Sequence, residues 1–151
     1  MTLAEPPKIH PGELATPNDL RRLADEYRKA AHHLLALGRR GDPLSRAPYR
    51  LSAIHAIELY LNALLLHRGH AADQVRRMRH DLAARAEPAI ACGLRLRKRT
   101  AAHLVALVGN REYVVTRYGP EMTATVSQIN RLNATLEEVA SKVTAIIDPP
   151  K

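Results

Sequence analysis

Three polar residues interrupt the most apolar stretch of the chain. This stretch, YRLSAIHAIELYLNALLLH, runs from Tyr49 to His67 and is apolar on nearly every side when it is drawn as a helix. The exceptions are His55, Glu58 and Asn62, which fall within an arc of roughly 60° at about 100° per residue. An imidazole, a carboxylate and an amide on one face can together hold a ligand. A carboxylate there is costly without partners, so we expect Glu58 to be needed for function or for structure.

Basic residues are concentrated in the middle of the chain. The net charge is +8, and between Arg68 and Arg99 nine Lys and Arg residues stand against three acids, a local balance of +6. This excess predicts a surface for a polyanion, with nucleic acid as the first candidate. The predicted patch consists of Arg76, Arg77, Arg79, Arg95, Arg97 and Arg99. An ordinary solvated surface is an equal alternative, because residues 76–99 contain no Phe, Trp or Tyr on which a base could stack.

Helical patterns account for most of the chain. Thr16 to Asp19 combines a capping threonine, a proline and an acid, which is typical of a helix start, and apolar residues then repeat at helical spacing until Gly38. Further helices are expected at Tyr49–His67, at Ala71–Arg79 with an extension that Pro88 stops, from Thr100 through Val115, and from Met122 to Ile147. The last helix keeps a seven-residue apolar repeat. We expect it to pack along the first helix, with a second subunit as the alternative partner.

These patterns predict an all-α bundle of about five helices without a sheet. We divide the chain into a loose, flexible arm at residues 1–15, one helical domain at 16–148 and a tail at 149–151. The helix at 49–67 is too apolar for five helices to cover easily. We therefore also predict a symmetric homodimer, which would bury the surplus surface.

Composition excludes several classes of protein. No apolar run is long enough to span a membrane, because Glu58 interrupts the best candidate, and the N-terminus lacks the basic end and apolar block of a secretory signal. The lone Cys92 cannot form an internal disulfide, so we expect a reducing, cytoplasmic location. We expect no metal and no cofactor, since the sequence has neither the Cys and His spacing of a zinc site nor a glycine-rich phosphate loop.

Three motifs in order resemble those of the HEPN family. AIHAIELYLNAL at residues 53–64 is similar to the AxExxxKA helix of that family. HDL at 80–82 is similar to its HxL motif, and YVVTRY at 113–118 is similar to its YxxxRYP motif. The match covers roughly residues 19–120 and extends to the order and spacing of the helices.

The resemblance implies an up-and-down helical bundle that usually dimerises and binds a nucleotide or RNA. Members often occur beside a nucleotidyltransferase-like partner or within a toxin–antitoxin pair. It points to one ligand-binding or structural cluster, formed by His55, Glu58, Asn62, His80, Tyr113, Arg117 and Tyr118. Arg117 is expected to pair with Glu58, either to lock the helices together or to line a ligand pocket. This chain departs from the family pattern at Asn62, where a lysine is usual, and at Gly119, which precedes Pro120.

Nuclease members of the family carry an arginine followed, after four to six residues, by a histidine. In this chain Arg97 and His103 fit, although they lie earlier than the family pattern suggests. His103 would act as general base on a ribose 2′-hydroxyl, and Arg97 would stabilise the charge that builds on phosphorus. Three functions stay open: a binding module for a nucleotide, RNA or partner protein, which we prefer, a metal-independent endoribonuclease, and a non-catalytic helical adaptor.

Overall fold

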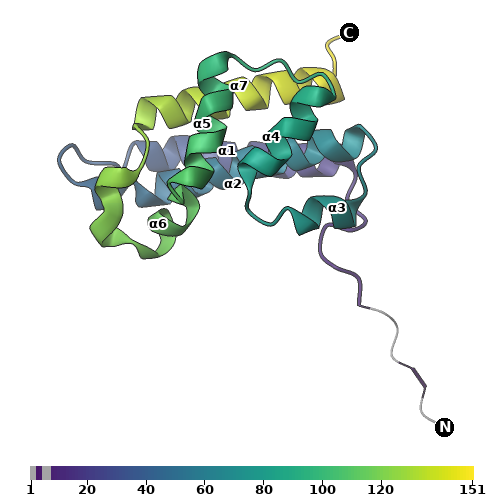
Figure 1. The fold of residues 1–151 in the computed structure, drawn as a ribbon, viewed down its shortest axis with the longest axis horizontal. Helices are drawn as coiled ribbons and strands as arrows, with labels where there is room; N and C mark the ends of the chain where they lie inside the picture. Colours follow the sequence, from purple (N-terminus) through teal and green to yellow (C-terminus); the bar gives the residue numbers. More distant parts are fainter. Residues whose placement is uncertain (1–2, 5–7) are drawn as a thin grey trace.

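The computed structural model describes residues 3–4 and 8–151, and every regular element in this part of the chain is helical (Figure 1). The α-helices are α1 (Pro17–Leu35), α2 (Ala47–His67), α3 (Ala72–Arg77), α4 (Leu82–Ala91), α5 (Lys98–Gly109), α6 (Glu112–Tyr118) and α7 (Ile129–Ile147). Two 3₁₀ helices, η1 (Pro43–Arg46) and η2 (Pro120–Thr125), precede α2 and α7. The predicted all-α bundle is confirmed, with helices that are shorter and more numerous than the expected five.

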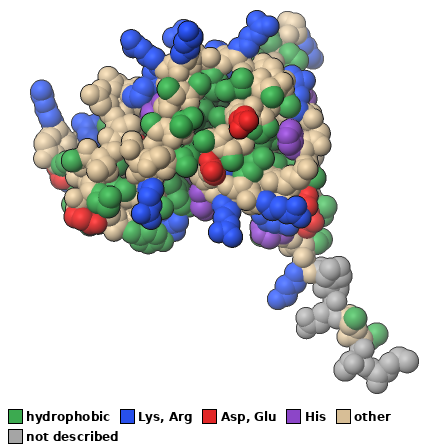
Figure 2. All heavy atoms as spheres, viewed as in Figure 1, with side chains coloured by type: hydrophobic (Ala, Val, Ile, Leu, Met, Phe, Trp, Pro, Cys, Tyr) green, Lys and Arg blue, Asp and Glu red, His purple; other side chains and the backbone are tan. Residues whose placement is uncertain are grey.

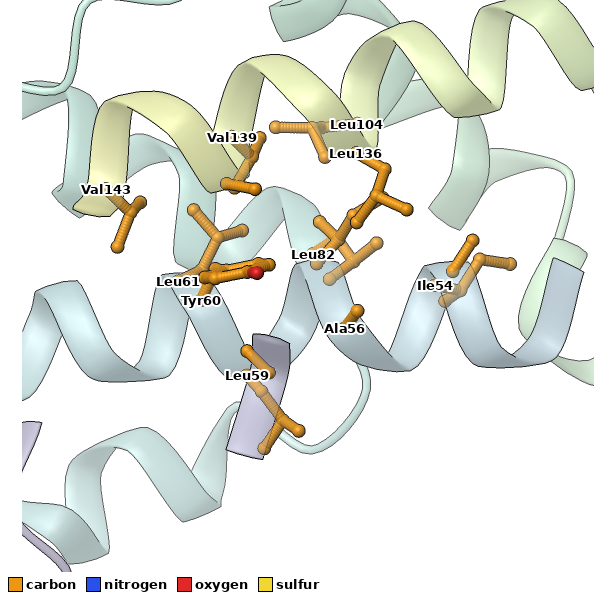
Figure 3. Packing of buried hydrophobic residues seen from close by; sticks show 14 of the residues in the cluster. Ile54, Ala56, Leu59, Tyr60, Leu61, Leu82, Leu104, Leu136, Val139 and Val143 are labelled. Carbon is orange, nitrogen blue, oxygen red and sulfur yellow. The ribbon is translucent and has the colours of Figure 1, made fainter. Parts of the chain in front are cut away.

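α2 lies at the centre of the bundle and is buried almost all round. Thirteen of its 21 residues are buried within a single copy of the chain, because α1, α4, α6 and α7 pack against it. Leu61 of α2 lies near Val139 of α7, and Leu82 of α4 belongs to the same cluster (Figure 3). The premise that one copy cannot cover this helix was therefore wrong. The homodimer itself stays a prediction.

α1 begins where the sequence predicts. Thr16 Oγ1 accepts a hydrogen bond from the Asp19 backbone N–H at 3.0 Å, and the Asp19 carboxylate accepts one from the Thr16 N–H at 3.0 Å. This capping box, with Pro17 in the first turn, fixes the start of the helix. Residues 8–15 precede it without a regular helix, whereas Pro6 and Pro7, which contributed to the predicted arm, lie outside the described residues.

The middle of the chain forms four short helices where two longer ones were predicted. Arg79 separates α3 from α4 with a left-handed backbone (φ 50°), and Arg111 separates α5 from α6 in the same way (φ 52°). The predicted stop at Pro88 was wrong, because α4 continues to Ala91. A proline inside a helix is unfavourable. Here the helix continues past the proline, and the next residue, Ala89, is fully buried in the core.

α7 begins later and packs on a different partner than predicted. Met122 lies in η2, so the long helix starts only at Ile129. Its apolar side faces mainly α2, and the expectation that α1 would be its chief partner was wrong. α1 meets α7 through an ion pair between Arg28 and Glu137.

The buried apolar side chains form one cluster with contributions from α1, α2, α4, α5 and α7. The division into an arm, one domain at 16–148 and a tail stays a prediction. Among the described residues, no helix is both long enough and apolar enough to cross a membrane.

Candidate functional site

Glu58 is the centre of a buried polar cluster. The residue is 8% exposed, and its carboxylate faces three groups from different parts of the fold. His80 Nδ1–H donates to Oε1 at 3.0 Å, while Arg85 lies 3.8 Å from Oε1 and His55 Nδ1 lies 3.8 Å from Oε2. A buried carboxylate with a cation and a hydrogen-bond donor remains charged at much lower cost than an isolated one. The prediction that Glu58 needs partners is confirmed.

The cation comes from Arg85 of α4, which the sequence analysis missed. Its side chain is 3% exposed, and its Nε donates to Asn62 Oδ1 at 2.6 Å, so it joins two of the three polar residues of α2. Two further bonds run from its guanidinium to the backbone carbonyls of Asp81 and Val75. Burial lowers the pKa of Arg85, and the nearby Glu58 and Asp81 oppose that shift. We call His55, Glu58, Asn62, His80 and Arg85 the polar cluster.

Arg117 does not pair with Glu58, and that prediction was wrong. Its NH1 donates to the Tyr113 hydroxyl at 2.9 Å, and its guanidinium lies over the rings of Tyr113 and Tyr118 at 5.1 and 4.9 Å. α6 is only seven residues long and places Arg117 one turn beyond Tyr113. Arg117 therefore reaches Glu58 only indirectly, through Tyr113 and His80.

His80, Tyr113, Arg117 and Tyr118 form a continuous stack, which we call the stacking ladder. The His80 and Tyr113 rings are stacked with centroids 4.3 Å apart, and Arg117 covers the two tyrosines. The outer end is open to solvent, since Tyr118 is 69% exposed. The inner end is fixed, because His80 is bonded to Glu58. The seven residues of the predicted cluster are thus connected: Arg85 joins Asn62 to Glu58, and His80 joins Glu58 to the rest of the stacking ladder.

His55 completes the polar cluster on the α1 side. Its ring meets Tyr27 of α1 edge-on, with centroids 4.5 Å apart. Burial lowers the pKa of His55, and the Glu58 carboxylate partly opposes the shift. His55 is therefore held as a neutral imidazole near pH 7.

A second buried ion pair, between Arg50 and Glu112, is separate from the polar cluster and was also missed. Arg50 of α2 donates to Glu112 Oε1 at 2.8 Å and to the Ser127 carbonyl at 2.6 Å, and Glu112 is fully buried. This pair fixes the start of α6 and the segment before α7. It holds Tyr113 in place and leaves no charge free for a ligand.

Arg97 and His103, the predicted catalytic pair, are not placed as a pair. Arg97 caps α5, and its backbone N–H donates to Glu138 at 2.7 Å. His103 is 5% exposed, its Nδ1 is bonded to Thr135 Oγ1 at 2.6 Å, and its Nε2 is buried without a partner. Burial lowers the pKa of His103. The geometry gives this pair no support as a nuclease centre.

The predicted basic patch is divided between two edges of the molecule. Arg76, Arg77 and Arg79 belong to α3 and the turn after it, whereas Arg95 and Arg99 belong to the connection into α5 and its first turn. α3 and the start of α5 lie on opposite edges in Figure 1, and Figure 2 shows Lys and Arg side chains along both edges. A single continuous patch was therefore a wrong expectation. The two halves must be considered separately.

Comparisons with known proteins found no relative of this chain. No family model, curated protein or solved structure matches the chain. Within the residues that the structure describes, no three His, Cys, Asp or Glu side chains are placed to hold a metal ion. The resemblance to HEPN stays a hypothesis, and a function must be argued from the geometry.

Proposed function

We propose that this chain is a helical module that binds a nucleotide or single-stranded RNA on the stacking ladder. The observation that carries the proposal is the exposed end of the ladder, where Tyr118 offers one ring face to solvent and Arg117 covers the other. Unpaired bases stack on tyrosine rings and on guanidinium planes, and arginine also binds phosphate. The resemblance to HEPN implies a ligand of the same class.

The polar cluster supports this proposal because it makes the ladder rigid. His80 is hydrogen-bonded to Glu58, and Glu58 forms an ion pair with Arg85. Tyr113 stacks on His80 and so connects the rest of the ladder to these residues. A preorganised stack loses less side-chain entropy when a base adds to it. In this proposal Glu58 positions the ladder and does not touch the ligand.

The test is the affinity of a labelled oligoribonucleotide for two matched variants of Tyr118, measured by fluorescence anisotropy. Tyr118→Phe keeps the ring face, and its affinity should stay within about twofold of the wild type. Tyr118→Leu keeps apolar area but removes the ring. It should lose about 1–3 kcal/mol of binding, or about five- to 150-fold in Kd. Equal affinities for the two variants, or no binding by the wild type at low salt, would overturn the proposal.

A metal-independent ribonuclease is the second candidate, at different residues from those first predicted. The observation that favours it is the Glu58–His80 pair, in which the carboxylate orients Nδ1 and the half-exposed ring leaves Nε2 to a substrate. Such an imidazole can take the proton of a 2′-hydroxyl. RNA cleavage that persists with a chelator and is abolished in His80→Ala would support it. RNA that binds but stays intact favours the binding module.

A further inference from the structure

A groove between α5 and the start of α7 is lined by cations and amides and by no acid. Its volume is about 580 Å³. Arg99 and His103 come from α5, Gln128, Asn130 and Arg131 come from the start of α7, and three alanines lie between them. Across the described residues, neither Arg99 nor Arg131 forms an ion pair with a carboxylate. The lining of the groove is therefore positively charged, and the nearest carboxylates beside Arg99 and Arg131 are those of Glu137 and Glu138 in the adjoining pocket.

The first turn of α7 adds to this positive charge. α7 is 19 residues long and has neither a side-chain cap nor an acid in its first turn. The first hydrogen bond from its backbone runs from Leu132 N–H to the Gln128 carbonyl. The amides of residues 129–131 are therefore free for another acceptor, and the helix dipole favours an anion at this end.

Two buried donors in the same groove lack partners. His103 Nε2 and Arg131 Nε are shielded from solvent and have no hydrogen bond. Buried polar atoms without partners are rare in folded proteins, and an ion or a water commonly explains them. His103 belongs to α5, so its unpartnered nitrogen is an observation independent of the end of α7.

The tautomer of His103 that accepts a hydrogen bond from Thr135 makes its free nitrogen a donor. The Thr135 hydroxyl accepts from Arg131 NH2 at 3.4 Å, so its own hydrogen is available for His103 Nδ1 at 2.6 Å. Burial lowers the pKa of His103, which keeps the ring neutral, and a neutral ring that accepts at Nδ1 carries its proton on Nε2. His103, Arg131 and Arg99 thus all offer N–H groups and no lone pair.

We infer that this groove is a binding site for a phosphate group. A phosphate dianion supplies several strong acceptors, which the two arginines, the imidazole N–H and the free amides of α7 can satisfy together. The arginines repel a metal ion or a cationic ligand, and the side-chain acceptors in the lining are only the neutral amide oxygens of Gln128 and Asn130. The inference is independent of the stacking ladder, because the two sites share no residue.

Ala134 lies in the wall of the groove and allows a test with matched variants. It is exposed, three residues after Arg131, so a side chain placed there does not disturb the core. Ala134→Asp introduces a carboxylate that repels phosphate and pairs with Arg131, whereas Ala134→Asn has almost the same shape without the charge. Arg99→Gln removes one cation, and Arg95→Gln removes an equally exposed cation outside the groove.

Inorganic phosphate is titrated into each protein at constant ionic strength with chloride, and amide and imidazole nitrogen spectra are recorded by NMR. We expect shifts at Asn130, Arg131 and the His103 ring in the wild type, Ala134→Asn and Arg95→Gln. Ala134→Asp and Arg99→Gln should bind phosphate about tenfold more weakly or not at all. Absence of these shifts in the wild type, or equal titrations for Ala134→Asp and Ala134→Asn, would overturn the inference.

The same spectra identify the source of the phosphate. If the group belongs to RNA, a long oligoribonucleotide should shift the same amides at lower concentration than inorganic phosphate, and Ala134→Asp should block this. If it belongs to a small phosphorylated compound, the oligoribonucleotide should leave these amides unshifted while inorganic phosphate still binds. A loss of RNA affinity in Tyr118→Leu with unchanged phosphate shifts would show that the two sites are independent.

Discussion

At the scale of single residues, Glu58 and Arg85 are a buried pair of opposite charge. Both side chains are almost fully shielded, and Arg85 also satisfies Asn62 and two backbone carbonyls. Removing one partner of a buried pair is far more costly than neutralising both, because the first change leaves an uncompensated charge. The pair therefore has a clear signature in a double-mutant cycle.

Arg85→Met should destabilise the protein by about 3–5 kcal/mol, and Glu58→Gln by about 1–2 kcal/mol, in urea unfolding. The double variant should be less unstable than the sum, by about 1 kcal/mol or more. Additive effects would mean that the two charges do not interact. If Glu58→Gln keeps its stability but loses RNA affinity, the cluster belongs to the binding site itself.

Two histidines, the buried His103 and the partly exposed His55, make stability depend on pH in a defined window. Burial lowers the pKa of His103 and of His55 from the ordinary value of 6.5. Below about pH 6.5 these histidines bind more protons in the unfolded chain than in the folded chain. The free energy of unfolding must therefore fall as pH falls. At higher pH both states are neutral, and this contribution is fully present.

We expect the urea midpoint to decrease between pH 7 and about pH 5.5, with His103 contributing at most about 1.4 kcal/mol per pH unit. His103→Gln should flatten this dependence, while His33→Gln, at an exposed position of α1, should leave it as in the wild type. Identical pH profiles for all three proteins would contradict the assignment of His103. Below about pH 4.5 we expect a further decrease in the free energy of unfolding, to which Glu137 contributes. Burial raises the pKa of Glu137, but the hydrogen bonds from Arg28 and His32 outweigh burial and lower it.

The residues of the cluster could be predicted only in part from sequence. His55, Glu58 and Asn62 were recognisable because they are polar on an apolar helix, and His80 was found through the HDL motif. Arg85 gave no signal of its own among the many arginines of a basic segment. Arg85 is buried because the left-handed turn at Arg79 brings α4 back against α2. No local sequence pattern specifies that turn.

At the scale of elements, the sequence predicts those whose signals are local. The capping box of α1 is written in four adjacent residues, and the apolar stretch of α2 appears as helix from Ala47 to His67. The breaks were missed because they depend on tertiary contacts. The left-handed turn at Arg111 is held by the buried pair of Arg50 and Glu112, whose members are far apart in the chain.

The division of the basic residues has a consequence at the scale of the whole molecule. Arg79 directly precedes His80, the inner residue of the stacking ladder, so Arg79 is the basic residue of this edge that lies next to the ladder. Arg95 and Arg99 lie toward the other edge, with the phosphate groove. An RNA of about four nucleotides, near the lower limit of known single-strand site sizes, should reach only one of these groups.

The salt dependence of binding should therefore distinguish the two edges. For such a short RNA on the ladder, each lost phosphate contact lowers the slope of log affinity against log salt by about 0.7. Arg79→Asn, which tolerates the left-handed backbone at this position, should lower the slope by about this amount, while Arg99→Gln should leave it unchanged. The reverse result would place the short RNA across α5 and α7, because only phosphates near Arg99 could then release counterions. Equal reductions of the slope in both variants would mean that the short RNA contacts both edges at once, which would contradict their separation in the fold.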